Sequence, residues 1–176
     1  MNKIIECVPN FSEGRDPAVI RQITDAIESV RGVRLLDVDP GESTNRTVVT
    51  FVGAPEPVKE AAFRAARKAA ELIDMAQHQG EHPRFGATDV CPFVPVAGAS
   101  MEECAAMARE VGRRIGEELG IPVYLYEHAA SRPERRPSTG PGWIPPISRR
   151  RPSTSTGSSA GWSSIAASWR RRRTRH

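Results

Sequence analysis

The stretch that decides the fold is residues 33–52, which read VRLLDVDPGESTNRTVVTFV. Residues 33–39 predict one strand. Residues 47–52 predict a second, in which Thr47, Val49 and Phe51 alternate with the other three residues. A short polar turn that includes Pro40 and Gly41 separates the two strands, so we predict an antiparallel β-hairpin.

One strand and one helix are predicted before the hairpin, and one helix and one extended segment are predicted after it. Residues 3–8 read as a strand, and Asp16 followed by Pro17 predicts the start of a helix. A second helix is predicted from about residue 57 to 75 and an extended segment over residues 90–96. The order β-α-β-β-α-β predicts a ferredoxin-like α+β sandwich with its helices on one face of the sheet.

A further helix and strand extend this predicted sandwich. Ser100 and Glu103 have the spacing of a capping box, and the helix that they begin is predicted to end near Gly120. Residues 123–126 are apolar and aromatic, and they predict a last strand.

The composition changes at about residue 136. Residues 137–176 hold eight Arg, nine Ser and five Pro but no Lys, Asp or Glu, so the 21 acidic residues all lie in the first part of the chain, against 17 of the 25 basic residues. Such a segment cannot bury enough apolar surface to offset chain entropy. We therefore predict one domain over residues 1–135 and a disordered basic tail over residues 136–176.

Two readings of the tail remain open. Residues 170–173 are four consecutive Arg, which could contact nucleic acid or acidic lipid, although a nucleic-acid partner is not the favoured interpretation. The alternative hypothesis is a frameshift near codon 136, because a GC-rich gene read in the wrong frame produces this composition. Translation of the other two frames tests it: an acidic, helix-forming continuation should appear in one of them.

The cysteines and the lengths of the apolar segments indicate the cellular compartment in which the protein is expected. Cys7, Cys91 and Cys104 lack the spacing of a zinc or redox pair, and the N-terminus lacks the apolar run of a signal peptide. Nowhere do about 18 apolar residues follow one another, as a membrane helix would need. These observations predict a cytoplasmic protein that makes no membrane contact.

The segment from residue 78 to 92 reads HQGEHPRFGATDVCP and concentrates reactive side chains in a loop. Its first five residues match the H-x-x-E-H pattern of inverted zinc peptidases. That chemistry needs both histidines on one helix, whereas Gly80 weakens a helix and Pro83 ends it. We therefore predict no metal site.

A second interpretation of this segment involves His82 without His78, as a group that transfers protons. A neutral imidazole can take a proton from an amine nucleophile and hand it on, with Asp39, Glu81 or Asp89 to stabilise the charged form. Arg84 could hold a carboxylate through a bidentate pair. The alternative is that His82 only forms hydrogen bonds within its loop.

Two further polar loops follow or precede strands, at residues 8–14 and 43–47. Taken alone, the first reads as an ordinary strand-to-helix connection and the second as the entry to a hairpin. Together with the loop of His82, they could converge on one cleft. Glycine-rich phosphate-binding loops are absent from the sequence.

The sequence resembles a known family in five ordered motifs. The sequences are ECVPNFSEG at 6–14, LLDVD at 35–39, STNRT at 43–47, GEHPR at 80–84 and DVCPF at 89–93. In these motifs the chain is similar to glutamate formimidoyltransferase, specifically to the N-terminal subdomain of its formiminotransferase domain, over about residues 2–135.

The resemblance implies transfer of a formimino group from N-formimino-L-glutamate to tetrahydrofolate, a co-substrate, in histidine degradation. It implies that His82 is the catalytic histidine, acting first as a base and then as an acid, and that Asp39 stabilises its imidazolium. Substrate- or folate-binding roles are implied for Asn10, Ser12, Asn45, Arg46 and Arg84.

The second subdomain that the resemblance calls for is absent from this sequence. Half of a cleft cannot hold two substrates in attack geometry, so we expect little transferase activity unless another chain supplies the missing half. The partner expected is that subdomain or a second copy of this chain. A non-enzymatic α+β module that binds folate or a protein is the alternative hypothesis.

Overall fold

The predicted hairpin forms the middle of an antiparallel sheet. The computed structural model describes residues 2–81 and 84–131. Strand β4 pairs with β3 on one side and with β1 and β2 on the other, and these two pair in turn with β6 and β5. The strands are β1 (Ile4–Cys7), β2 (Asn10–Phe11), β3 (Val33–Gly41), β4 (Arg46–Gly53), β5 (Thr88–Val90) and β6 (Phe93–Ala97).

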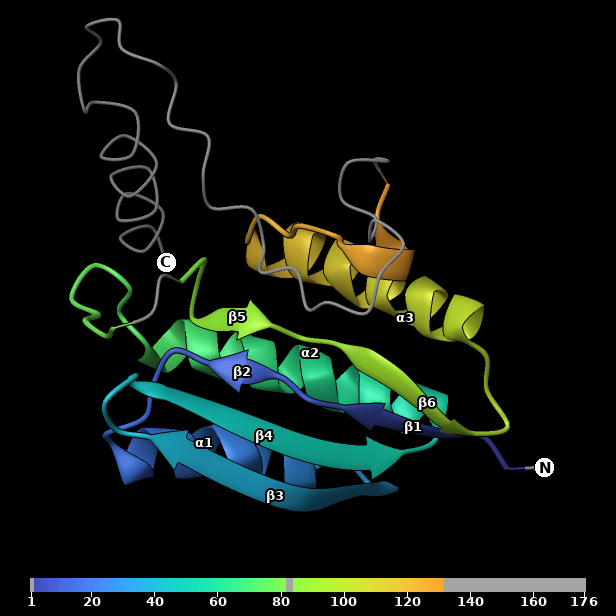
Figure 1. The fold of residues 1–176 in the computed structure, drawn as a ribbon, viewed down its shortest axis with the longest axis horizontal. Helices are drawn as coiled ribbons and strands as arrows, with labels where there is room; N and C mark the ends of the chain where they lie inside the picture. The colour runs from blue at the N-terminus through green and yellow to red at the C-terminus, as the bar shows by residue number, and fades with distance from the viewer. Residues whose placement is uncertain (1, 82–83, 132–176) are drawn as a thin grey trace, which may run out of the picture. The chain divides into compact units, whose positions relative to one another are not determined.

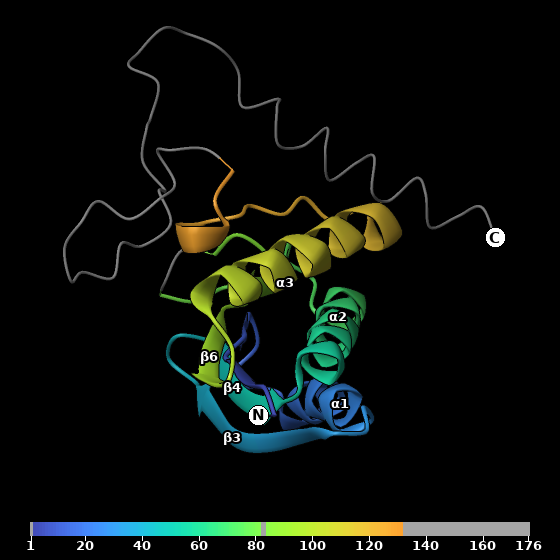
Figure 2. The ribbon, with the colours of Figure 1, turned by 90° about the vertical axis from the view of Figure 1, so that its right-hand side faces the viewer.

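Three helices cover one face of this sheet, which curls around them (Figure 1, Figure 2). They are α1 (Pro17–Glu28), α2 (Pro55–Leu72) and α3 (Met101–Arg114). Two short helical turns follow, Ile115–Leu119 and Glu127–Ala129. The mixed α/β architecture and the β-α-β-β-α-β order are confirmed, with β2 and β5 as short continuations beside β1 and β6.

The helix starts follow from local sequence. The Asp16 carboxylate accepts from the backbone N–H groups of Ala18 and Val19, and Pro17 occupies the first turn, where its missing N–H costs nothing. Ser100 and Glu103 form the predicted capping box, with both reciprocal hydrogen bonds present. These caps fix where α1 and α3 begin.

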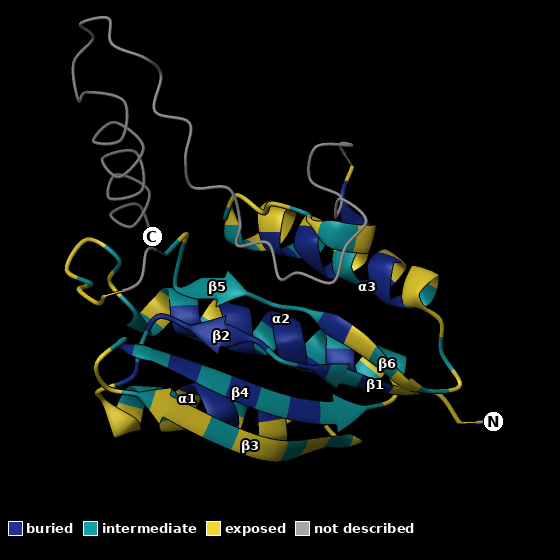
Figure 3. Cartoon of the chain, in the orientation of Figure 1, coloured by how far each residue is buried: buried dark blue, intermediate teal, exposed yellow. Residues whose placement is uncertain are grey.

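The alternation in β4 separates a core face from an open face. Thr47, Val49 and Phe51 are buried toward the helices, whereas the residues between them are only half-buried (Figure 3). Fully or almost fully buried side chains of α1 and α2 meet them. Since facing residues of paired strands share a face, this alternation also assigns the faces of β1, β2 and β3.

Phe51 is expected to carry a large share of the stability because its side chain is fully buried at the centre of this core. Replacing Phe51 by Ala should lower the free energy of unfolding by about 3–5 kcal/mol, through lost transfer free energy and a cavity. Urea unfolding followed by circular dichroism measures the change. Leu36→Ala, at a half-exposed position of β3, should cost far less; equal losses would contradict this placement of the core.

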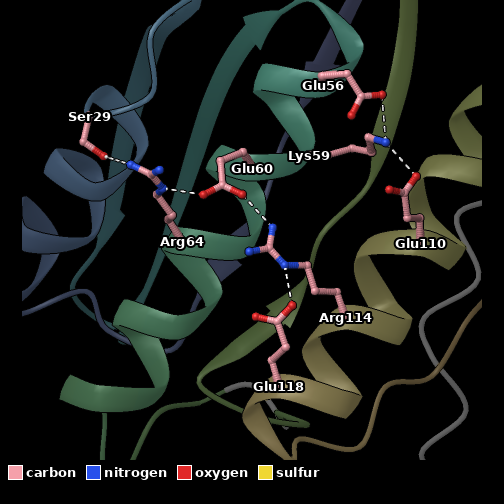
Figure 4. A network of polar contacts seen from close by, with 8 residues as sticks. All are labelled: Ser29, Glu56, Lys59, Glu60, Arg64, Glu110, Arg114 and Glu118. Atoms are coloured by element: carbon pink, nitrogen blue, oxygen red, sulfur yellow. Dashed lines mark hydrogen bonds and ion pairs between the residues drawn. The ribbon is translucent and has the colours of Figure 1, made fainter.

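A network of charged side chains joins the three helices (Figure 4). Glu60 on α2 accepts from Arg64 on its own helix and from Arg114 on α3, each at 2.6 Å. Arg114 also lies over the Phe63 ring, 3.6 Å from its centroid, and Arg64 reaches Ser29 after α1. Exposed ion pairs contribute little singly, so the network fixes helix orientation more than it stabilises the fold.

Two local predictions are wrong. Residues 123–126 form no strand, because Val123 and Leu125 lie against Gly112 of α3 instead of pairing with the sheet. Asn10 and Phe11, predicted as part of a turn, form β2 between β4 and β5. The predicted division at residue 135, and the tail over residues 136–176, fall outside the described residues.

Within residues 2–81 and 84–131, every helix is too short or too polar to cross a membrane.

Candidate active site

Three loops and one strand meet at the end of the sheet where β2 and β5 lie. They are the β2–α1 connection, the turn between β3 and β4, the segment that follows α2, and β5 itself (Figure 1). Hydrogen bonds link all of these elements, so the predicted convergence of the polar loops is observed for their described residues. We call residues 12–14, 42–47, 78–81 and 84–90 the loop cluster.

Asn45 ties two of the loops to the hairpin turn. It is buried and has a positive φ of 49°, a conformation that asparagine tolerates better than most residues. Its Oδ1 accepts from Gly14 N at 2.9 Å, and its Nδ2 donates to the Gln79 carbonyl at 3.0 Å. The side chain predicted to bind substrate is therefore committed to holding the loops together.

Ser12 and Thr47 have similar structural roles. The Ser12 hydroxyl is fully buried and donates to the Gly86 carbonyl at 2.8 Å, while its backbone N–H donates to Ala87. The Thr47 hydroxyl donates to the Glu13 carbonyl at 2.5 Å. Both hydroxyls give a hydrogen bond to a backbone carbonyl of a loop and so tie the loops to their neighbours.

Two glycines permit the close approach of the backbones. A Cβ on Gly14 would collide with the Gly41 carbonyl and lie 2.5 Å from Arg46 N. A Cβ on Gly80 would collide with the Thr44 carbonyl. No larger residue fits at either position without separating the loops.

Arg46 and Asp89 bring opposite charges to the cluster. Arg46 Nη2 lies 3.7 Å from Asp89 Oδ2, and Asp89 Oδ1 accepts from Phe85 N at 3.1 Å. The Asp89 side chain is only 5% exposed. Arg46 Nε is buried and has no hydrogen-bond partner among the described residues.

Arg84 reaches across the cluster from the segment after α2. Its Nη2 donates to the carbonyls of Thr44 and Asn45, and its Nε donates to His78 Nε2 at 3.2 Å. In the described part of the chain, its buried Nη1 has no partner. Burial lowers the pKa of Arg84, an effect that nearby Asp89 opposes and Arg46 reinforces.

Asp39 and Asn10 lie in one row across the open face of the sheet. Both are register partners of Val48, Asp39 from β3 and Asn10 from β2. Asp39 is exposed, and Asn10 is buried with its amide donating to the Val8 carbonyl at 3.1 Å. His82, the residue on which the predicted chemistry depends, lies outside the described residues.

Sequence reasoning did not identify two contacts that shape this site. His78 appeared only as part of a zinc pattern, and its contact with Arg84 had no sequence signal. The pairing of Arg46 with Asp89 joins residues far apart in the chain. No group of three metal-ligating side chains occurs within the ranges 2–81 and 84–131.

An open groove lies elsewhere in the described part of the chain. It has a volume of about 500 Å³ and runs between α3 and residues 120–125. It shares no residue with the loop cluster.

Comparison with known proteins agrees with the motif resemblance. The model of the family described as the formiminotransferase domain, N-terminal subdomain, matches residues 4–139. Glutamate formimidoyltransferase from Thermoplasma acidophilum is 56% identical over 132 residues, which are 75% of this chain and 44% of that protein. The one from Streptococcus pyogenes serotype M1 is 52% identical over 77% of this chain and 46% of its own length.

Longer relatives match over the same part of the chain. The formimidoyltransferase-cyclodeaminase of Mus musculus is 60% identical over 136 residues, which are 77% of this chain and 25% of that protein. The chain therefore spans less than half the length of these three relatives. The family match covers most of the sequence and includes every described residue of the loop cluster, so the chain belongs to the family of the formiminotransferase domain, N-terminal subdomain.

Proposed function

We propose that residues 1–135 supply one half of the active site of a glutamate formimidoyltransferase, with N-formimino-L-glutamate and tetrahydrofolate as substrates. The observation that carries the proposal is the loop cluster, in which Arg46 and Arg84 both keep a buried N–H without a described partner. Buried donors on two arginines suit a carboxylate ligand, and both substrates carry carboxylates. The proposed location is the cytoplasm, where free thiols such as those of Cys7 and Cys104 persist.

The proposed reaction needs one proton to move between two nitrogen atoms. The N5 amine of tetrahydrofolate attacks the formimino carbon, the bond from that carbon to the glutamate nitrogen breaks, and glutamate leaves. His82 accepts the proton from N5 and returns it to the departing glutamate nitrogen, so it ends in its starting state. Asp39 stabilises the intermediate imidazolium in this proposal.

The described side chains fall into two groups under this proposal. Arg46 and Arg84 contact substrate, with Asn10 beside them at the sheet end. Ser12 and Asn45 act indirectly, because their polar atoms hold the loops together. The second subdomain supplies the opposing wall, and without it the reacting atoms are not held in attack geometry.

A chimeric enzyme tests the proposal. Residues 4–135 of this chain replace the matching segment of the Thermoplasma acidophilum relative, so that its remaining sequence supplies the other half. We expect the chimera to transfer the formimino group, measured as steady-state formation of 5-formiminotetrahydrofolate. A folded chimera that binds tetrahydrofolate without turnover would instead favour a non-enzymatic folate-binding module.

A further inference from the structure

The ring of His78 lies beside the guanidinium of Arg84. Arg84 Nε donates to His78 Nε2 at 3.2 Å, and both residues are half-buried. An arginine nitrogen carries hydrogen at every accessible pH and cannot accept. His78 Nε2 must therefore be the unprotonated nitrogen, which leaves the single ring proton of neutral imidazole on Nδ1.

Asn45 offers the other contact to the ring. Its Nδ2 carries two hydrogens, donates one to the Gln79 carbonyl at 3.0 Å, and lies 3.4 Å from His78 Nδ1. A neutral ring accepts at only one nitrogen, so the contacts at Nδ1 and Nε2 cannot both be hydrogen bonds to the ring. Its Oδ1 accepts from Gly14 N, which fixes the orientation of the amide. Donation from the charged guanidinium to Nε2 is the stronger interaction of the two available to the ring.

The hydrogen bond to His78 adds to those that hold the Arg84 guanidinium in place. The carbonyls of Thr44 and Asn45 hold Nη2, and His78 holds Nε, so two of the three guanidinium nitrogens are tied to the protein. A Cβ on Gly80 would lie 2.9 Å from Nη2, which shows how closely the loop surrounds this side chain. Nη1 is buried and has no hydrogen-bond partner within the described residues.

We propose that neutral His78 is a positioning residue that aims Arg84 Nη1 at a carboxylate ligand, and that protonation of His78 releases the guanidinium. A protonated ring presents an N–H and a positive charge to Arg84 at the same place where it now accepts. The identity of the ligand rests on the proposed function, whereas the contact and its dependence on pH do not.

Four charged residues surround His78. Burial lowers the pKa of His78 below its ordinary value of 6.5, and the charges of Arg84 and Arg15 lower it further. Glu13 and Asp89 act in the opposite direction. His82 follows four positions later in the sequence and lies outside the described residues.

The pH dependence follows from the direction of this shift. The unfolded chain binds a proton to His78 at a higher pH than the folded chain does, so acidification favours states without the contact. The stability that the contact adds is complete above about pH 6.5. It declines as the pH falls through the lower pKa of the folded protein.

Nitrogen-15 NMR of the full chain tests this proposal without any turnover. At pH 7.5 we expect His78 in the Nδ1–H form and a slowly exchanging Nε–H signal from Arg84. Acidification should remove that signal with the same midpoint as the titration of His78, below pH 6.5. A proton on Nε2 at pH 7.5, or an Arg84 signal unaffected by the titration, would overturn the proposal.

Three variants separate positioning from a general structural effect. His78→Gln keeps an acceptor that does not titrate, so the Arg84 Nε–H should stay protected at acidic pH. His78→Ala should lose that protection at all pH values. His128→Gln, at the exposed histidine near the end of the described chain, should behave as the wild type does. If the two substitutions at His78 have the same effect, the proposal is wrong.

The chimera adds a functional readout. Its KM for formiminoglutamate should rise as the pH falls through the pKa of His78, and His78→Gln should remove that rise. A rise that persists in His78→Gln would contradict the positioning role. An inactive chimera would count against the proposed function alone, since the NMR result stands independently of it.

Discussion

Replacing His82 by Ala in the chimera is expected to lower kcat for formimino transfer by about 10²–10⁴-fold, the usual contribution of general acid–base catalysis. The loss follows because no other group would then receive the proton from the folate N5 and return it to glutamate. Steady-state rates at saturating concentrations of both substrates measure the effect. Binding of tetrahydrofolate, followed by fluorescence, should change little because the imidazole acts mainly in the transition state.

His128→Ala is the matched control for this experiment. His128 is exposed in the short turn Glu127–Ala129, and its carbonyl rather than its ring contacts Arg109. Removing its ring should leave both kcat and KM unchanged. A His82→Ala chimera that retains more than a tenth of the parent rate would contradict the catalytic role of His82.

Gly14→Ala is expected to have the largest effect of any glycine-to-alanine substitution at the described glycines. Its Cβ would meet two backbone groups of the hairpin, the Gly41 carbonyl and Arg46 N, and neither can rotate away as a side chain would. We expect a loss of about 2–3 kcal/mol in the free energy of unfolding, the upper range for overpacking. Urea unfolding of the full chain measures it.

The same substitution should also disturb the site. Separation of the β2–α1 connection from the hairpin would break the bond from Gly14 N to Asn45 Oδ1 and displace the Asn45 amide. Gly116→Ala is the control, because the nearest atom to its Cβ, the Ile121 carbonyl oxygen, lies at an ordinary 3.8 Å. If both variants unfold at the same urea concentration, the close packing at Gly14 is not important for stability.

Much of the fold could be predicted because its signals are local. The alternation of Thr47, Val49 and Phe51 identifies the core face of β4 without knowledge of its neighbours. Asp16 with Pro17 locates the start of α1 in the same way. Strand β2 could not be predicted, because two residues carry no periodicity and its pairing depends on β4 and β5, which lie far away in the chain.

For the candidate site, the types of residue that gather there could be predicted, but the role of several of them could not. Polar loops beside strand ends indicated where the cluster would form, and Arg46 and Arg84 do lie there with unsatisfied donors. The structural roles of Ser12 and Asn45 could not be inferred, because each depends on backbone groups more than 30 positions away. The contact of Arg84 with His78 likewise depends on how the loop folds back on itself.

We propose that this chain provides half of a transferase site and needs the other half for turnover. The most direct test assays the 176-residue chain and the chimera side by side, at equal concentration, for formation of 5-formiminotetrahydrofolate. We expect turnover by the chimera and none above background by the chain alone. Robust turnover by the chain alone, abolished by His82→Ala, would contradict it.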